Sequence, residues 1–223
     1  MRRSIELLEA LKQSGVNATL KDPLWWPNSG TFDVVVGAVL AQQSKWERVE
    51  ESLQRLRSHA VLHVEALADA QESLLKHCIQ PSGCFEAKAK NLKALAVAIG
   101  EEFGSFEAFA LHVTRSWLLA QRGVGPETAD AILCYGCYQE ALVVDRYTAI
   151  LLAFYGYAFE DYGSMQEWCL EGLEEEARLD ALYGKRLSKA EVYARFHGKI
   201  VEFCKGKVKK GVLTQGVPGL YPD

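Results

Sequence analysis

The residue whose type and position best suit acid–base chemistry is Asp145. It follows the short apolar run Leu142–Val144 and precedes a segment, extending through Phe154, whose apolar residues have helical spacing. An aspartate at this point caps the start of a helix, because its carboxylate accepts backbone N–H groups of the first turn. The same carboxylate can stabilise a developing positive charge or deprotonate a water molecule. Because helix caps are far more common than catalytic residues, the interpretation of Asp145 depends on what accompanies it.

A tight turn between two expected helices lies about twenty residues before Asp145. Gly123 and Gly125 flank Val124, and Pro126 stands at a first helical position, where its missing N–H is not needed. Glycines let a phosphate approach the backbone N–H groups at a helix N-terminus. Gly-Val-Gly alone would equally suit a plain helix–helix turn.

The elements that must position these residues are expected to be helices. Nearly every segment has the apolar period of a helix; Val34–Val36 could form a strand, but the sequence offers it no convincing partner. We therefore predict an all-α fold of about ten to twelve helices. Gly104 should end one helix and Ser188 should begin another. The stretch 211–223, rich in glycine and proline, is expected to be a loose tail.

The charge balance limits the kind of partner. The chain has 223 residues and a formal net charge of −4, which argues against a protein that coats nucleic acid through general basicity. Basic residues nevertheless cluster near the C-terminus, where a solvated helix face is the simplest interpretation: Arg195, Lys199, Lys205, Lys207, Lys209 and Lys210. No apolar run reaches the roughly 18–20 residues that span a bilayer, and no signal peptide is recognised. We expect a cytoplasmic monomer with no membrane contact.

The cysteines do not predict a cofactor. The chain has six, in apparently helical and apolar segments, which suits reduced thiols. Cys134 and Cys137 form a C-x-x-C pair, but no second pair or histidine pair completes a zinc site. We expect no metal and no cofactor.

Taken together, the turn and the aspartate resemble the helix-hairpin-helix DNA glycosylases related to endonuclease III. In that family the hairpin is followed, through one helix, by a Val-Asp segment that bears the essential aspartate, as in the run Gly123–Thr148 here. Upstream, Phe32–Ser44 resembles the family's apolar helix ending in glutamine, and Ile79–Ala89 resembles its Gly-aromatic-x-x-Lys-Ala loop and helix. The resemblance covers most of residues 25–155.

The resemblance implies a fold, a partner and several site residues. It implies two helical lobes with a DNA cleft between them, with residues 25–138 as the central domain and residues 1–24 plus 139–223 as the second lobe. Asp145 would be catalytic, and Gln43 and Phe85 would fill the gap that a flipped nucleotide leaves in double-stranded DNA. The hairpin residues would bind DNA phosphate: Gly123, Val124, Gly125 and Thr128.

Two departures from endonuclease III narrow the implied activity. Bifunctional members carry a lysine nucleophile where this chain has Glu127, so no Schiff base can form there and lyase activity is not expected. Endonuclease III also ends in four clustered cysteines that hold an iron–sulfur cluster, whereas this C-terminus has only Cys204. Lys199 lies in the corresponding region and, if buried, would need an anionic partner or chemical neutralisation.

The tryptophans near the start favour one class of substrate within the family. Trp25, Trp26, Pro27 and Trp46 lie on segments that the family folds around its base pocket. Methylated purines carry positive charge, and a cation over an aromatic face gains about 0.5–2 kcal/mol when desolvated. At least one of Trp25 and Trp26 should belong to the core instead. The resemblance is thus to monofunctional glycosylases that excise alkylated bases, chiefly 3-methyladenine, in base excision repair.

Three alternatives remain at this stage. The chain could be an endonuclease III-like glycosylase for oxidised pyrimidines or mismatches, a non-catalytic DNA-binding module that uses only the hairpin, or a helical protein–protein scaffold. The role of Asp145 also stays open between general base and electrostatic stabiliser. His197 could act as an acid but is interpreted as structural.

Overall fold

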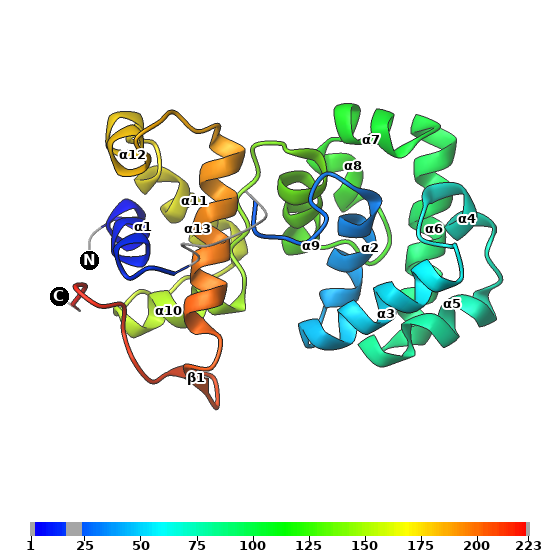
Figure 1. Cartoon of the computed structure of the whole chain (residues 1–223), viewed down its shortest axis with the longest axis horizontal. Coiled ribbons are helices and arrows are strands. Elements are labelled where there is room, and N and C mark those ends of the chain that lie inside the picture. The colour runs from blue at the N-terminus through cyan, green and yellow to red at the C-terminus, as the bar shows by residue number, and fades with distance from the viewer. Residues whose placement is uncertain (1–2, 17–23, 222–223) are drawn as a thin grey trace. The chain divides into compact units, whose positions relative to one another are not determined.

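The computed structural model describes residues 3–16 and 24–221 of the chain. Over these residues it contains thirteen α-helices, one short 3-10 helix, one π-helix and two strands of two residues each (Figure 1). The predicted all-α class is confirmed. None of the helices in these ranges is long and apolar enough to cross a membrane.

The chain divides into two compact units. Unit 1 comprises residues 1–26 and 140–223, and unit 2 comprises residues 27–139. The boundaries predicted from the sequence, at residues 25 and 138, lie close to these divisions, but they assign Trp25 and Trp26 to the wrong part of the chain.

Unit 2 is a bundle built around two helices of contrasting sequence. Helix α2 (Phe32–Ala41) is apolar on all sides and almost entirely buried, so Val34–Val36 belong to a core helix and not to a strand. Helix α6 (Phe85–Phe103) has one apolar stripe and ends at Gly104, whose φ is 77°. The other elements of the unit are α3 (Trp46–Ser58), α4 (Val64–Asp69), α5 (Glu72–Ile79), η1 (Gln80–Ser82), α7 (Phe106–His112), α8 (Arg115–Leu119), α9 (Pro126–Ala131) and η2 (Ile132–Gly136).

Unit 1 is organised around α13 (Lys189–Cys204), which Figure 1 shows in orange among the helices of that unit. Twelve of its sixteen residues are buried, and Ser188 begins it with a capping box in which Ser188 and Glu191 cap each other's backbone. Helices α1 and α10 both pack against it. The elements of this unit are α1 (Ser4–Gln13), α10 (Arg146–Phe154), α11 (Tyr162–Gly172), α12 (Glu176–Tyr183), α13, β1 (Val208–Lys209) and β2 (Val212–Leu213).

The stretch after α13 is more ordered than the sequence predicted. Strands β1 and β2 pair as an antiparallel hairpin, with Val208 opposite Leu213 and Lys209 opposite Val212. Further on, the Val217 backbone N–H donates to the Tyr155 hydroxyl at 2.7 Å, and Val217 is 2% exposed. The expectation of a loose tail is therefore wrong for the described residues up to 221, because a buried apolar side chain and a buried hydrogen bond anchor it.

Candidate active site

Asp145 caps the first turn of α10, as the sequence predicted. The apolar residues Leu142–Val144 before it are buried and bring the chain to the start of the helix. One carboxylate oxygen, Oδ1, accepts the Thr148 backbone N–H at 2.9 Å and the Thr148 hydroxyl at 3.1 Å. The cap therefore occupies one oxygen of the carboxylate.

The second oxygen of Asp145 faces His197, a buried residue of α13. Oδ2 lies 3.7 Å from His197 Nε2, and the two side chains are 16% and 4% exposed. Burial by itself would raise the pKa of Asp145, but the ion pair with the imidazole and the two bonds from Thr148 outweigh it and lower the pKa below its usual value. The geometry thus places a nearly buried carboxylate beside an imidazole, an arrangement that lowers its pKa.

His197 is in turn packed against Trp25. The two rings meet edge to face, with centroids 5.3 Å apart. The Trp25 indole N–H donates to Glu202 Oε1 at 3.0 Å. A Cβ atom on Gly198 would lie 2.6 Å from the Trp25 ring, so only glycine allows this approach of the ring to α13. Trp25, His197 and Asp145 therefore form one connected group inside unit 1.

Trp26 packs edge to face against Trp25, with centroids 6.1 Å apart, and is 7% exposed. It is the more buried of the two tryptophans. The structure brings both of them to the unit that contains Asp145, whereas the sequence assigned them to the central domain. Pro27 and Trp46 belong to unit 2, where Pro27 is exposed and Trp46 is the half-buried first residue of α3.

The predicted hairpin lies in unit 2 between α8 and α9. Gly123 has a φ of 79°, and the Val124 N–H donates to the Gln121 carbonyl at 3.2 Å, which closes the turn. Gly125 is the N-cap residue of α9 and, as glycine, has no side chain with which to cap it. Pro126 occupies the first helical turn, as predicted.

Gln42 fixes the hairpin to the end of α2. Its amide Nε2 donates to the Gly123 carbonyl and to the Thr128 hydroxyl, both at 2.9 Å. Thr128 is 6% exposed, so its hydroxyl has a structural role in holding the hairpin in place. Asn91 packs so closely against the turn that a Cβ on Gly123 would come within 2.0 Å of its Nδ2.

The two residues predicted to fill the DNA stack lie on neighbouring segments of unit 2. Gln43 is exposed, follows α2 and has a φ of 52°; Cys84, which precedes Phe85, has a φ of 48°. The buried Lys88 joins these segments, because its Nζ donates to the carbonyls of Leu40 and Ser82, both at 2.9 Å. The structure therefore brings both predicted wedge segments together around one buried cation.

Five of the six cysteines are buried or half-buried thiols, and Cys84 is exposed. Burial raises the pKa of Cys134 and of Cys137 to about 12, which disfavours the thiolate that binds metals. Cys204 at the end of α13 is likewise buried, with a pKa raised to about 12. Among the residues that the structure describes, no group of three or more histidine, cysteine or acidic side chains is placed to hold a metal ion.

Lys199 is buried on α13, the case in which the sequence analysis expected it to need a partner or neutralisation. It is 6% exposed, and its Nζ donates to the backbone carbonyl of Val16. Burial, together with the positive charges of Arg195 and Lys12, lowers its pKa to about 8. The carbonyl satisfies one donor of the ammonium group without neutralising its charge.

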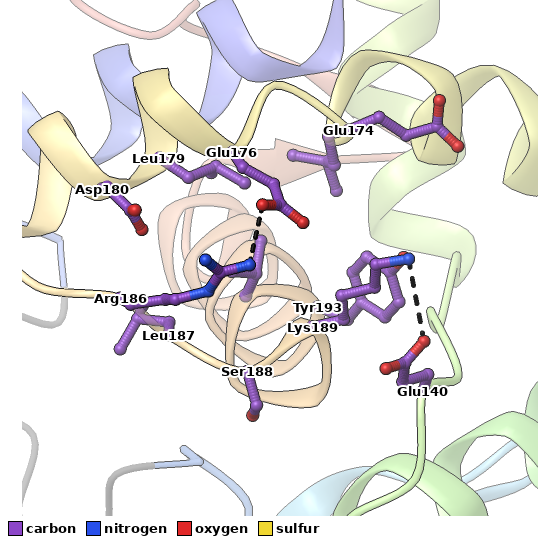
Figure 2. A pocket seen from close by; sticks show the side chains of 12 residues that line it. Glu140, Glu174, Glu176, Leu179, Asp180, Arg186, Leu187, Ser188, Lys189 and Tyr193 are labelled. Atoms are coloured by element: carbon purple, nitrogen blue, oxygen red, sulfur yellow. Dashed lines mark hydrogen bonds and ion pairs between the residues drawn. The ribbon is translucent and has the colours of Figure 1, made fainter.

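Unit 1 also contains a polar pocket of about 360 Å³ between α12 and the start of α13 (Figure 2). Its acidic side chains are partly paired: Glu176 with Arg186 at 2.8 Å and Glu140 with Lys189 at 3.8 Å, as the dashed lines in Figure 2 show. None of the residues that line it is among those predicted for the active site.

Comparison with known proteins identifies the family. Residues 36–179 match the family described as HhH-GPD superfamily base excision DNA repair protein. A protein of Methanocaldococcus jannaschii named as a DNA repair glycosylase is 34% identical over 203 residues, which cover 87% of this chain and 86% of that protein. This chain belongs to the HhH-GPD superfamily of base excision DNA repair proteins. Its general activity is therefore that of a DNA glycosylase.

Two solved structures resemble the fold. A 3-methyladenine DNA glycosylase of H. pylori, bound to 1,N6-ethenoadenine, is 42% identical, covers 93% of this chain and 99% of its own, and has a TM-score of 0.88. An endonuclease III in a non-covalent DNA complex is 18% identical and covers 94% of this chain and 89% of its own, with a TM-score of 0.67, and it shows the shared fold.

The sequence did not reveal the contacts of three residues that shape the site. Gln42 appeared only as part of the polar end of an apolar helix, and Lys88 only as part of a motif. His197 was interpreted as structural, although it faces the carboxylate directly. A polar side chain on the buried face of a helix was the one local signal for His197 and Lys88, and this signal identifies no partner.

Proposed function

We propose that this chain is a monofunctional DNA glycosylase that excises alkylated bases, chiefly 3-methyladenine, from double-stranded DNA. The observation that carries the proposal is the position of Asp145: its carboxylate is nearly buried, and only one of its oxygens is used by the helix cap. Such a carboxylate suits a reaction in which positive charge develops on a sugar, because low surrounding polarity strengthens its stabilising effect.

The chemistry that Asp145 must perform is limited because the substrate is cationic. The bond from C1′ to the base nitrogen breaks with its electron pair going to the base, which leaves as a neutral molecule and needs no protonation. Water forms the new bond to C1′ and releases a proton, for which the Asp145 carboxylate is the acceptor or which it directs to solvent. His197, fixed 3.7 Å from Oδ2, positions the carboxylate and keeps it ionised.

Aromatic side chains support the assignment of an alkylated base. We assign Trp25 of unit 1 to the base pocket, since indole faces attract a positively charged purine more strongly than a neutral pyrimidine. The assignment of Trp26, Pro27 and Trp46 to that pocket stays a prediction from the sequence. The glycosylase of H. pylori that this chain resembles, at 42% identity, is a 3-methyladenine enzyme with a modified adenine bound. Both considerations favour alkylated purines over oxidised pyrimidines.

Glu127 favours a glycosylase without lyase chemistry. A bifunctional glycosylase needs an amine to form a Schiff base with the sugar, and a carboxylate cannot do so. Glu127 lies on the first turn of α9, the position at which such an amine would stand in a family member of that class. The product should therefore be an intact abasic strand.

The remaining parts of the proposal concern the grip on DNA. The backbone of Gly123, Val124 and Gly125, with Thr128 holding the hairpin in place, would bind phosphate without a basic side chain. Gln43 and Phe85 would occupy the space of the extruded nucleotide.

The test is a profile of released bases. Duplex DNA treated with a methylating agent is incubated with the wild-type chain and with Asp145→Asn, free bases are separated by chromatography, and strand breaks are counted with and without alkali. We expect 3-methyladenine from the wild type alone and breaks only after alkali. Release of oxidised pyrimidines instead, or breaks without alkali, would contradict the substrate or the monofunctional assignment respectively.

A further inference from the structure

The β-hairpin that follows α13, formed by β1 and β2, carries two exposed lysines whose side chains make no contact with another described residue that stabilises it. Its turn consists of Lys210 and Gly211, whose φ values of 50° and 80° are those of a two-residue turn with both central residues left-handed. Lys209 and Lys210 are both exposed. Asparagine and glycine are the easier choices at such turn positions, so a lysine with positive φ is unusual for folding alone.

The hairpin is held firmly against unit 1. The Lys207 carbonyl accepts both the Thr214 N–H at 2.9 Å and the Thr214 hydroxyl at 2.8 Å. Lys207 Nζ donates to the Phe203 carbonyl at 3.1 Å and lies 4.5 Å from the Phe203 ring centroid. Leu213 is 4% exposed, and β2 packs on α10. Lys207 thus anchors the hairpin to unit 1, whereas Lys209 and Lys210 are exposed on the anchored hairpin.

The tip of the hairpin lies beside the residue that follows Asp145. The guanidinium of Arg146, the first residue of α10, has its Nη2 only 3.7 Å from where a Cβ on Gly211 would be. Arg146 is exposed. We define the basic surface as Arg146, Lys209 and Lys210; it combines the start of the helix that Asp145 caps with the tip of the hairpin.

The charge of this surface is not neutralised by its surroundings. Neither α10 nor the described stretch from Phe203 to Tyr221 contains an acidic residue. None of its three cations makes an ion pair or a side-chain hydrogen bond with another described residue, whereas elsewhere in unit 1 Arg178 pairs with Glu9 and Arg186 with Glu176. In a chain with a net charge of −4, this concentration of unpaired positive charge is a local exception.

We propose that the basic surface binds the phosphate backbone of DNA beside the nucleotide on which Asp145 acts. This inference rests on the proposed function of Asp145. A carboxylate is repelled by the phosphates that flank its substrate, and the positive charge of the basic surface, which begins at the residue after Asp145, offsets this repulsion. Each cation that reaches a phosphate also releases condensed counterions, which favours binding and makes it depend on salt. The surface contacts no base, so it adds affinity without sequence preference.

The test measures the salt dependence of DNA binding by the full chain. The probe is a duplex with a tetrahydrofuran abasic-site analogue, and the dissociation constant is determined by fluorescence anisotropy over a range of salt concentrations. We expect the double variant Lys209→Gln, Lys210→Gln to bind more weakly and its log–log salt slope to be smaller by about 1.8, that is about 0.9 for each lost phosphate contact. Arg146→Gln should lower the slope by about half as much.

A matched control has the same change in charge at the far end of α13. Lys185 and Lys189 are exposed in the same unit, and the sixteen residues of α13 place Lys189 about 24 Å from the hairpin end of the helix. The variant Lys185→Gln, Lys189→Gln should keep the wild-type slope. Equal slopes for the hairpin variant and the wild type, or an equal loss in the control, would overturn the proposal.

The failure of this inference can be told apart from the failure of the proposed function. At saturating enzyme in a single turnover, the control variant Lys185→Gln, Lys189→Gln should release 3-methyladenine at the wild-type rate, because it changes neither the basic surface nor Asp145 and His197. A wild type that releases no alkylated base but shows the expected slopes would refute the substrate assignment alone. A wild type that releases the base while the hairpin variant keeps its slope would refute the basic surface alone.

Discussion

The first turns of α10 and α9 both have backbone N–H groups without a partner inside the helix, and the two helices differ in what accepts them. The start of α10 is closed by the Asp145 side chain, which accepts two hydrogen bonds from Thr148. The start of α9 has Gly125 at the same position and no side chain there to accept the N–H groups of the first turn. A helix N-terminus carries partial positive charge in both cases, and the difference is whether the protein or a ligand supplies the negative group.

The surroundings of the two N-termini differ accordingly. Around Asp145 the neighbours are buried side chains that act on charge, His197 foremost. Around the α9 hairpin they are side chains that hold the backbone: Gln42 bonds to Gly123 and Thr128, and Asn91 fills the space beside Gly123. The comparison teaches that unit 1 sets the protonation state of a single carboxylate, whereas unit 2 sets the path of a turn. We infer that the first serves the chemical step and the second serves the grip on DNA.

The largest effect is expected from Asp145→Asn. Asparagine caps a helix about as well as aspartate, so in thermal unfolding the variant should lose only the stability that the lowered pKa of the carboxylate contributes. The loss of the ionised group should reduce the rate of base release by a factor of about 10²–10⁴, measured in single turnovers on methylated DNA. If the variant kept nearly the wild-type rate, Asp145 would be a helix cap without a catalytic role.

The next largest effect is expected from Gly123→Ala, which changes the turn before the N-terminus of α9. A non-glycine residue at a φ of 79° costs about 1–2 kcal/mol, and the new Cβ would push Asn91 aside. If the turn no longer presents its amides, the loss of one bond to a phosphate, about 1.5–3 kcal/mol, should weaken abasic-DNA binding about 10- to 100-fold.

Gly184→Ala is the matched control for backbone strain. Gly184 ends α12 with a φ of 67°, and a Cβ there would meet no atom within 4 Å. It should lose a similar amount of stability in thermal unfolding and keep its affinity for abasic DNA. If both glycine variants lost affinity equally, the hairpin would have no special role in binding.

A smaller effect, on pH dependence, is expected from His197→Gln. His197 lowers the pKa of Asp145, so its removal should raise that pKa and move the acid limb of the rate profile to higher pH. The lowered pKa of Asp145 also affects the pH dependence of the free energy of unfolding. A carboxyl group whose folded-state pKa is lowered stabilises the fold above its unfolded-state pKa, and this contribution is lost as the pH falls through the folded-state value. Single-turnover rates against pH for both proteins measure the shift; superimposable profiles would rule out this role.

The smallest effect is expected from Gln42→Ala, which removes two hydrogen bonds without straining the turn. Each such bond contributes about 1 kcal/mol, so the free energy of unfolding should fall modestly and DNA affinity a few-fold. Gln54, exposed on α3, provides the control: Gln54→Ala should change neither quantity. An affinity loss as large as that of Gly123→Ala would show that Gln42 contacts DNA itself.

The sequence predicted the features that form between residues close together in the chain, and it missed those that form between distant residues. The Asp145 cap, the hairpin between α8 and α9, the Ser188 N-cap and the stop at Gly104 are all set by residues within a few positions of one another, and each was predicted. The all-α class likewise followed from a local apolar period.

The features that sequence reasoning missed depend on distant residues. Gln42 and Gly123 are 81 positions apart, and Trp25 and its partner Glu202 are 177 apart, so no local pattern identifies either contact. This is also why Trp25 was assigned to the wrong unit. The tail after α13 was judged by its glycines and prolines, although the hydroxyl of Tyr155 on a distant segment anchors it.

The most direct test of this account separates rate from affinity in the two N-terminus variants on one DNA duplex that contains 3-methyladenine. Dissociation constants are measured with the abasic analogue of the same sequence, and single-turnover rates are measured at saturating enzyme. We expect Asp145→Asn to lose the rate and keep the affinity, and Gly123→Ala to lose the affinity and keep the rate once saturated. Loss of the same quantity in both variants would contradict the division of work between the two N-termini.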